Sequence, residues 1–336
     1  MSAVTSSPAD QEGAAPASGA SRPARLELVR RAGITVPFIL LFIVLSVTSS
    51  AFFTKTNLLN LLDQQSATLI IAAAGTLVIV AGGLDLSVGA VYALSGVVAG
   101  QLALHGSVVA AMVAALVVGL GVGLVNGILT TVLRINALIA TLAMSFVVAG
   151  AAGLVTSGNI IVLNSKPAFG RLAQSHFLTV TTSTWIAVFA VVMLAILLSR
   201  STLGRYTYAS GGNAGAARLA GVKVNQVKVV TYMLSGAAAA VGGLIDTSRV
   251  LSAQSSSGGD ALTFAVIAGI VVRGTSILGG EGAVWRTVLG VLFIALVSNG
   301  YNLIGLNALY EQITLGLIIL VAVGIDALSH FRSSSS

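Results

Sequence analysis

The sequence predicts an all-α integral membrane protein with about ten transmembrane helices. Of its 336 residues, 56% are hydrophobic and only 8% are charged, and the mean hydropathy is +0.99. Soluble domains carry about 25% charged residues, so this chain lacks the polar side chains that would cover a water-facing globule. The apolar residues also occur in long runs, as in helices that cross a bilayer. An enzyme of the aqueous phase is therefore excluded.

The first predicted span covers residues 33 to 51, close to the about 20 apolar residues that a bilayer requires. It follows residues 1 to 24, which have no apolar periodicity and are predicted to form a disordered cytoplasmic tail. Arg30 and Arg31 before the span, with small residues after it, also fit a cleaved signal. Because the following chain is itself apolar, we expect the segment to remain as the first helix.

Nine further apolar runs predict the remaining spans. They cover residues 58 to 82, 88 to 104, 108 to 128, 137 to 156, 183 to 199, 226 to 246, 260 to 278, 285 to 300 and 308 to 326. Arg273 and several glycines interrupt the run from 260, so a broken pair of helices is the alternative there. Residues 25 to 328 are thus predicted to form one transmembrane domain, followed by a cytoplasmic tail of residues 329 to 336.

The basic residues predict the orientation of these spans. If the N-terminal tail is cytoplasmic, 13 of the 17 Lys and Arg residues fall on or near the cytoplasmic side. The four exceptions are Lys55, Lys166, Arg171 and Arg249. Because cytoplasmic loops are enriched in Lys and Arg, we expect both termini to be cytoplasmic. The net charge of +7 is scattered between apolar runs, so no nucleic-acid partner is expected.

Two connections between spans are longer than the others. Residues 157 to 182 form an external segment that is suited to a lid or a docking surface. Residues 200 to 228 form the longest cytoplasmic loop, in which Asn213 can cap a helix and Gly221 can end it. We expect a two-turn helix that presents a compact knob to a partner. The alternative is a solvated basic loop.

The sequence predicts no catalytic, metal or cofactor site. The chain has no Cys, and its three His residues are too widely spaced for a compact metal motif. It also has no Gly-Lys dipeptide, which a phosphate-binding loop of an ATPase would require. A nucleotide site within this chain is therefore not expected.

Two groups of glycines predict close backbone contacts. Gly82, Gly83 and Gly89 break an apolar run and indicate a structural turn between two spans, with Asp85 inside it. Capping of the following helix by Asp85 is favoured over a proton or cation role, because capping requires no further partner. Residues 119, 123 and 127 are glycines on one helix face, which favours close packing against another helix.

Polar side chains cluster at the external ends of three predicted spans. Two interpretations fit them equally: they line a translocation path, or they form hydrogen bonds between helices. These candidates are Asn57, Asn60, Gln64, Asn299, Asn302, Tyr310 and Glu311.

Four motifs occur in order along the chain, at residues 76 to 89, 204 to 221, 274 to 282 and 299 to 306. With them, the sequence from about residue 34 to 326 resembles the permease subunits of ribose-type sugar ABC importers, the second carbohydrate-uptake class. Arg273 and the pair Trp285 and Arg286 depart from the usual family pattern, which commonly has smaller residues there.

The resemblance implies an ABC importer permease fold in the bacterial cytoplasmic (inner) membrane. It implies three protein partners besides membrane lipid: a second permease copy, a cytoplasmic ABC ATPase and an extracytoplasmic solute-binding protein. ATP and Mg²⁺ are then expected to bind to the ATPase. The implied cargo is a monosaccharide or related polyol. The alternatives are a permease for branched-chain amino acids or another small polar solute, and an ion-coupled secondary transporter.

The resemblance also places the contact with the ATPase on the expected cytoplasmic helix. The candidate coupling residues are Arg205, Asn213, Ala216, Ala217, Arg218 and Gly221.

Overall fold

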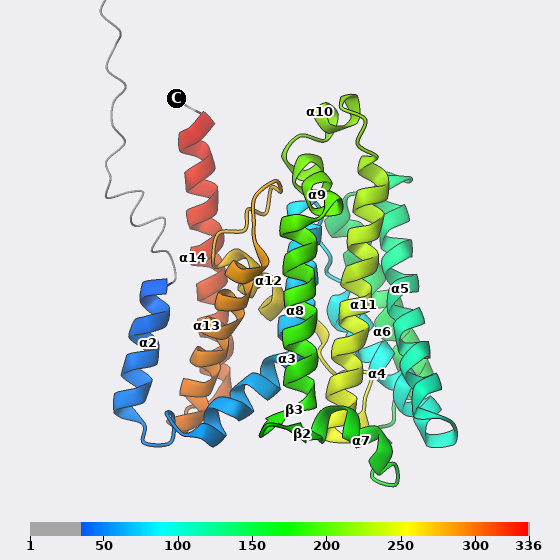
Figure 1. The fold of residues 1–336 in the computed structure, drawn as a ribbon, viewed down its shortest axis with the longest axis vertical. Coiled ribbons are helices and arrows are strands. Elements are labelled where there is room, and N and C mark those ends of the chain that lie inside the picture. The colour runs from blue at the N-terminus through cyan, green and yellow to red at the C-terminus, as the bar shows by residue number, and fades with distance from the viewer. Residues whose placement is uncertain (1–34, 335–336) are drawn as a thin grey trace, which may run out of the picture. The chain divides into compact units, whose positions relative to one another are not determined.

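A computed structural model describes residues 35 to 334 and consists almost entirely of helices (Figure 1). The tail predicted for residues 1 to 24 lies outside the described residues. At the other end, the last helix continues to Ser334, past the predicted domain end at residue 328.

The longer helices follow the predicted apolar runs, whereas α7, α9, α10 and the strands lie in the connections between those runs. The helices are α2 (Thr35–Thr48), α3 (Lys55–Val80), α4 (Val88–His105), α5 (Val108–Thr131), α6 (Ala137–Thr156), α7 (Pro167–Gln174), α8 (Thr182–Arg200), α9 (Thr202–Gly212), α10 (Ala214–Leu219), α11 (Val224–Val250), α12 (Gly259–Val271), α13 (Val284–Leu303) and α14 (Ala308–Ser334). The strands are β1 (Ile161–Val162), β2 (His176–Phe177), β3 (Val180–Thr181) and β4 (Ser252–Ala253).

The all-α membrane class is confirmed. Among the described residues, seven helices are long and apolar enough to cross a membrane: α3, α4, α5, α6, α8, α11 and α13. Three shorter apolar helices lie within α2, α12 and α14, so each predicted span overlaps one apolar helix of the described residues. Ten full crossings remain a prediction, because α12 has only 13 residues, fewer than the about 20 that a bilayer requires.

The span predicted over residues 260 to 278 is wrong in its second half. Helix α12 has 13 residues and ends at Val271, so Arg273 lies in the connection that follows it. At 1.5 Å per residue, such a helix is about 20 Å long, less than the about 30 Å of hydrocarbon in a bilayer. Gly274, Gly279 and Gly280 have φ values of +80°, +91° and +77°, which turn the backbone away from a helical path.

Helix α11 packs against α5, α4 and α3 and forms the centre of the bundle. The predicted glycine face on α5 is confirmed: a methyl group at Gly119 would overlap the carbonyl oxygen of Gly236 in α11. A methyl group at Gly123 would likewise lie 2.8 Å from the Cα atom of Met233. The two backbones therefore touch directly, as in closely packed membrane helices.

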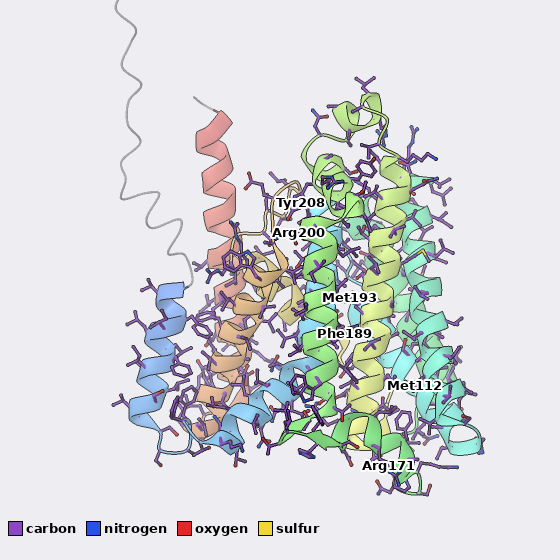
Figure 2. All side chains as sticks on the ribbon, viewed as in Figure 1. Met112, Arg171, Phe189, Met193, Arg200 and Tyr208 are labelled. Carbon is purple, nitrogen blue, oxygen red and sulfur yellow. The ribbon has the colours of Figure 1, made fainter. Side chains whose placement is uncertain are left out.

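The outer surface of the bundle is apolar along its length. Phe189 on α8 is 68% exposed, and α5 and α6 also expose large apolar side chains. Figure 2 shows Phe189 and Met193 along the middle of α8, with Arg200 toward one end of the bundle and Arg171 at the opposite end. Apolar side chains between charged ends are typical of a surface that faces lipid.

The bundle has two different ends (Figure 1). The α10 end carries α9 and α10, while the α7 end carries α7, β2 and β3. At the α7 end, β1 pairs with β4 in antiparallel register, and Ser248 of α11 donates a hydrogen bond of 2.7 Å to the carbonyl oxygen of Phe169. The long segment predicted over residues 157 to 182 is therefore folded against α11 rather than extended.

Candidate functional site

Helix α10 has the two caps that the sequence predicts. The side-chain oxygen of Asn213 accepts a hydrogen bond of 2.9 Å from the amide of Ala216, at the start of the helix. At the other end, Gly221 has a φ of +82°, and its amide donates to the carbonyl oxygen of Arg218 at 3.0 Å. The expectation of a short capped helix is thus confirmed, while its contact with a partner remains a prediction.

The loop predicted over residues 200 to 228 is largely helical. Helix α9 begins at Thr202, where the hydroxyl of Ser201 accepts a hydrogen bond of 3.0 Å from the amide of Gly204. Asn213 ends α9 and also begins α10, so the two helices share one residue. The element is therefore a pair of helices joined directly at Asn213.

Five of the six candidate coupling residues are exposed, but Ala217 is only 5% exposed. Ala217 contributes to the chain's own packing, since its carbonyl oxygen also accepts a hydrogen bond of 2.9 Å from the amide of Val222. Leu219, by contrast, is 93% exposed. Sequence reasoning missed Leu219, although an isolated leucine among Ala and Gly residues beside Arg218 was a signal that could have identified it.

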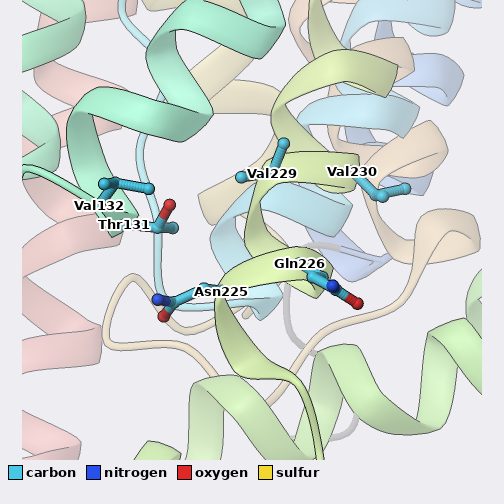
Figure 3. Close-up of a pocket in the computed structure, with 6 residues that line it drawn as sticks. All are labelled: Thr131, Val132, Asn225, Gln226, Val229 and Val230. Carbon is cyan, nitrogen blue, oxygen red and sulfur yellow. The ribbon is translucent and has the colours of Figure 1, made fainter.

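The arginines near α10 lie along its supporting helices. Arg205 donates a hydrogen bond of 3.2 Å to the hydroxyl of Thr202, within α9. Arg218 contacts the side-chain oxygen of Asn225 on α11 at 3.4 Å. Asn225 also belongs to a groove between the end of α5 and the start of α11 (Figure 3). The groove is lined by Thr131, Val132, Asn225, Gln226, Val229 and Val230.

The predicted turn after α3 is present. Gly82 has a φ of +74°, and the amide of Gly83 donates a hydrogen bond of 2.9 Å to the carbonyl oxygen of Val78. Gly89 lies in the first turn of α4 instead, where its amide donates to the hydroxyl of Thr263 at 3.1 Å. A side chain at Gly89 would overlap the backbone of Gly259, so this glycine permits α4 to pack against α12.

The prediction that Asp85 caps α4 is wrong in its detail. Ser87 is the cap residue, and Asp85 accepts hydrogen bonds from the Ser87 amide at 3.0 Å and the Ser87 hydroxyl at 2.7 Å. Its second oxygen accepts from the hydroxyl of Ser235 in α11 at 2.8 Å. Asn126 of α5 donates to Ser87 at 2.8 Å. The buried carboxylate therefore fixes the turn to α5 and α11, a role that sequence spacing did not reveal.

The external polar candidates separate into two groups. Asn57 of α3 and Asn299 of α13 bond to each other, and Glu311 accepts a hydrogen bond of 2.5 Å from Ser298. These three contacts agree with the interpretation as bonds between helices. The other four candidates have exposed side chains and are available to a path: they are Asn60, Gln64, Asn302 and Tyr310.

Asp63 is a further polar residue at the α7 end, and it was not among the candidates that the sequence predicted. It accepts a hydrogen bond of 2.7 Å from the hydroxyl of Thr181 and another from the hydroxyl of Ser183. These bonds connect α3 to the start of α8. Asp63 therefore anchors α3 at the end where Asn60 and Gln64 are exposed.

The two departures from the family pattern lie next to each other in space. The guanidinium carbon of Arg273 is 5.0 Å from the centre of the Trp285 ring, and that of Arg286 is 5.6 Å from it. Cations at these distances interact favourably with the aromatic face. The larger residues thus form one cation–π cluster between the connection after α12 and the start of α13.

Comparison with known proteins decides the family. Residues 57 to 323 match the family described as "Branched-chain amino acid transport system / permease component". The chain belongs to this family. The permease is accordingly a transport subunit and a multi-pass protein of the bacterial inner membrane. The ABC importer permease family also implies an ATPase and a solute-binding protein as partners.

Individual relatives cover nearly the whole permease. It is 40% identical over 301 residues to the ribose import permease protein RbsC of Bacillus subtilis (strain 168), covering 89% of this chain and 93% of that protein. It is 36% identical over 295 residues to RbsC of Escherichia coli (strain K12), covering 87% and 92%. The L-arabinose ABC transporter permease protein AraH of Azospirillum brasilense is 35% identical over 305 residues, covering 89% and 88%. No solved structure matches the permease significantly.

Proposed function

We propose that the permease is the membrane-spanning subunit of an ATP-driven importer of a monosaccharide or related polyol. The observation that carries this proposal is its similarity to permeases named for ribose and L-arabinose along nearly their full lengths. The structure adds a capped, outward-facing helix, α10, that is suited to transmit force from a partner. ATP and Mg²⁺ bind to that partner, not to the permease.

The ATPase contacts the α10 end in this proposal, and this end is cytoplasmic together with both termini. The charges support the orientation. The four basic residues predicted to be external belong to the α7 end: Lys55 begins α3, Lys166 and Arg171 belong to α7 and its cap, and Arg249 lies in the last turn of α11. Arg200, Arg205 and Arg218 lie toward the opposite end. This distribution is typical of a cytoplasmic α10 end.

Leu219 provides the main apolar contact with the ATPase. It is 93% exposed at the end of α10, beside the exposed Arg218 and Ala216. Complete burial of such a side chain in a partner cleft contributes about 1.5–3 kcal/mol. Ala217 supports this surface from beneath, because it is buried between α10 and the rest of the chain. The coupling residues thus divide into an outward contact surface and an inward support.

The remaining partners are a second copy of the permease, which completes the translocation path, and a solute-binding protein that delivers sugar at the α7 end. At this end, the exposed Asn60, Gln64 and Asn302 are suited to hydroxyl groups, since amide side chains both donate and accept hydrogen bonds.

A second candidate cargo is a branched-chain amino acid. The description of the matching family favours it, because that description names such transport systems. The named relatives favour sugar instead, since they resemble the permease over about nine-tenths of its length.

Transport by the purified complex distinguishes these possibilities. The permease is placed in vesicles with its partner ATPase and solute-binding protein. Uptake is then measured for radiolabelled ribose, L-arabinose, a panel of other monosaccharides and polyols, and leucine. We expect ATP-dependent uptake of at least one sugar or polyol, and none with a hydrolysis-deficient ATPase. ATP-dependent uptake of leucine alone would support the amino-acid alternative. Uptake that an ion gradient drives without the ATPase would contradict the proposal.

A further inference from the structure

Three separate segments meet backbone to backbone at the α10 end. They are the end of α3, the end of α9, and the connection between α12 and α13. We call their meeting point the glycine junction and define it as Val80, Gly82, Gly211, Gly279 and Gly280. The amide of Gly280 donates a hydrogen bond of 2.9 Å to the carbonyl oxygen of Val80. The junction therefore joins residues that lie up to 200 positions apart in the sequence.

The junction leaves no room for a side chain. A methyl group at Gly211 would overlap the carbonyl oxygen of Val80 and would lie 2.6 Å from the amide nitrogen of Gly280. A methyl group at Gly279 would lie 2.9 Å from the Cα atom of Gly82. Because rigid backbones touch here, no flexible side chain can absorb a displacement of one segment relative to another.

The junction lies directly beside the start of α10. Gly211 precedes Asn213 by two residues, and Asn213 is the residue that ends α9 and begins α10. Tyr208, one turn earlier on α9, donates a hydrogen bond of 2.6 Å to the carbonyl oxygen of Gly282. Burial raises the pKa of the Tyr208 phenol, although the Arg286 cation opposes this effect, so the hydroxyl keeps its proton and remains a donor. Two adjacent turns of α9 thus hold the same connection.

The segments that meet here continue through the bundle. Helix α3 runs from the junction to the exposed Asn60 and Gln64 near its other end. Helix α13 begins after the connection and runs to Asn299, which bonds to Asn57 of α3. Helices α3 and α13 are therefore linked near both ends. A movement of α9 at the junction reaches both of them without passing through α8 or α11.

We propose that the glycine junction passes the movement of α10 to α3 and, through the connection after α12, to α13. This inference rests on the proposed contact of α10 with the ATPase. Gly211 and Tyr208 are positioning residues in this scheme, because they act on the external path only through the helices that they hold. A displacement of α10 shifts the three backbones as one body, which is how packed helices transmit small movements.

The chain offers a matched pair of variants. Gly211→Ala overfills the junction, whereas Gly212→Ala places its methyl group no closer than 3.9 Å to any neighbouring atom, the Cα of Gly280. Spin labels on Lys55→Cys and Ser165→Cys, both at exposed sites in a Cys-free chain, report the position of the external end of α3. The distance between the labels is measured in the complex with the ATPase, before and after trapping with ATP and orthovanadate.

We expect trapping to change the label distance in the unmodified junction and in Gly212→Ala. In Gly211→Ala, the ATPase stays bound but the change is at least about threefold smaller. An equal change in Gly211→Ala and Gly212→Ala would overturn the proposal. If the Gly211→Ala permease does not bind the ATPase, the Tyr208→Phe variant is measured instead, because it removes one hydrogen bond without adding volume. A change in label distance as large as that in the unmodified permease would then overturn the proposal. Failure of the ATPase to bind the unmodified permease would instead refute the proposed function.

Discussion

Asn57 and Asn299 exchange two hydrogen bonds, of 3.1 Å and 3.0 Å, across the ends of α3 and α13. Each amide group donates to the other's oxygen, and the Asn57 amide also donates to the carbonyl oxygen of Phe52 at 2.9 Å. The pair lies 242 positions apart in the sequence and closes the α7 end of two helices that the glycine junction joins at the α10 end. It therefore belongs to the framework that positions the exposed polar residues nearby.

Substitution of one member of the pair should reduce stability. Asn57→Leu or Asn299→Leu leaves a partly buried amide without its partner, at a cost of about 1–3 kcal/mol. The double variant should lose less than the sum of the two single losses, because neither amide is then left unpaired. Thermal unfolding in detergent measures these effects. Asn60→Leu, at an exposed site on the same helix, serves as the control and should leave Tm unchanged; equal losses in all variants would contradict the framework role.

The exposed path candidates should show the opposite behaviour. Asn60→Leu and Gln64→Leu replace side chains that make no contact required for packing, so the complex with the ATPase should assemble normally. Uptake of the transported solute should fall by about tenfold or more, the amount that loss of hydrogen bonds worth about 1.4 kcal/mol produces. Uptake assays and size-exclusion chromatography of the same samples separate the two effects. If the folded complex is lost before transport, the path role is rejected.

The predicted topology can be tested by chemical labelling. Ser165→Cys and Ala220→Cys introduce single thiols at exposed positions of the α7 end and the α10 end. A membrane-impermeant maleimide should label the first from outside intact cells and the second only after the membrane is opened. Labelling of both from the same side would contradict the orientation.

Ala217 and its small neighbours allow a further prediction about α10. Because Ala217 is buried, Ala217→Asp should disturb the helix itself rather than only its outer surface. A buried unpaired charge costs several kcal/mol, so we expect α10 to become sensitive to added protease. Ala217→Ser should remain resistant. Equal protease resistance of the two variants would show that the methyl group of Ala217 does not support α10.

The sequence predicted those features that depend on local chemistry. The apolar runs identified every apolar helix, and the residues Asn213 and Gly221 identified both caps of α10, because hydropathy and capping act over a few neighbouring residues. The spacing of the glycines on α5 similarly predicted its close contact with α11. These features need no knowledge of which distant segments meet.

Features that depend on distant contacts could not be predicted. The spacing of Asn57 and Asn60 is compatible with a translocation path and with a hydrogen bond between helices. Only the position of Asn299, which bonds to Asn57, distinguishes the roles of the two residues. Burial in the short helices could not be predicted either. Ser210 of α9 and Ala217 of α10 face inward, while Leu219 of α10 faces outward. Helices of 11 and six residues carry too little periodicity to show this. The contact of Gly211 with Val80 joins segments that no local pattern connects.

Association of the ATPase with variants of α10 tests the central claim most directly. Leu219→Asp places a charge at the outermost apolar position of α10, and Leu178→Asp makes the same change at an exposed leucine of the α7 end. The affinity of the purified ATPase for each permease in detergent is the quantity to measure. Our account predicts that Leu219→Asp weakens binding by about tenfold or more, while Leu178→Asp binds like the unmodified permease. Unchanged binding by Leu219→Asp would contradict the claim that α10 is the contact with the ATPase.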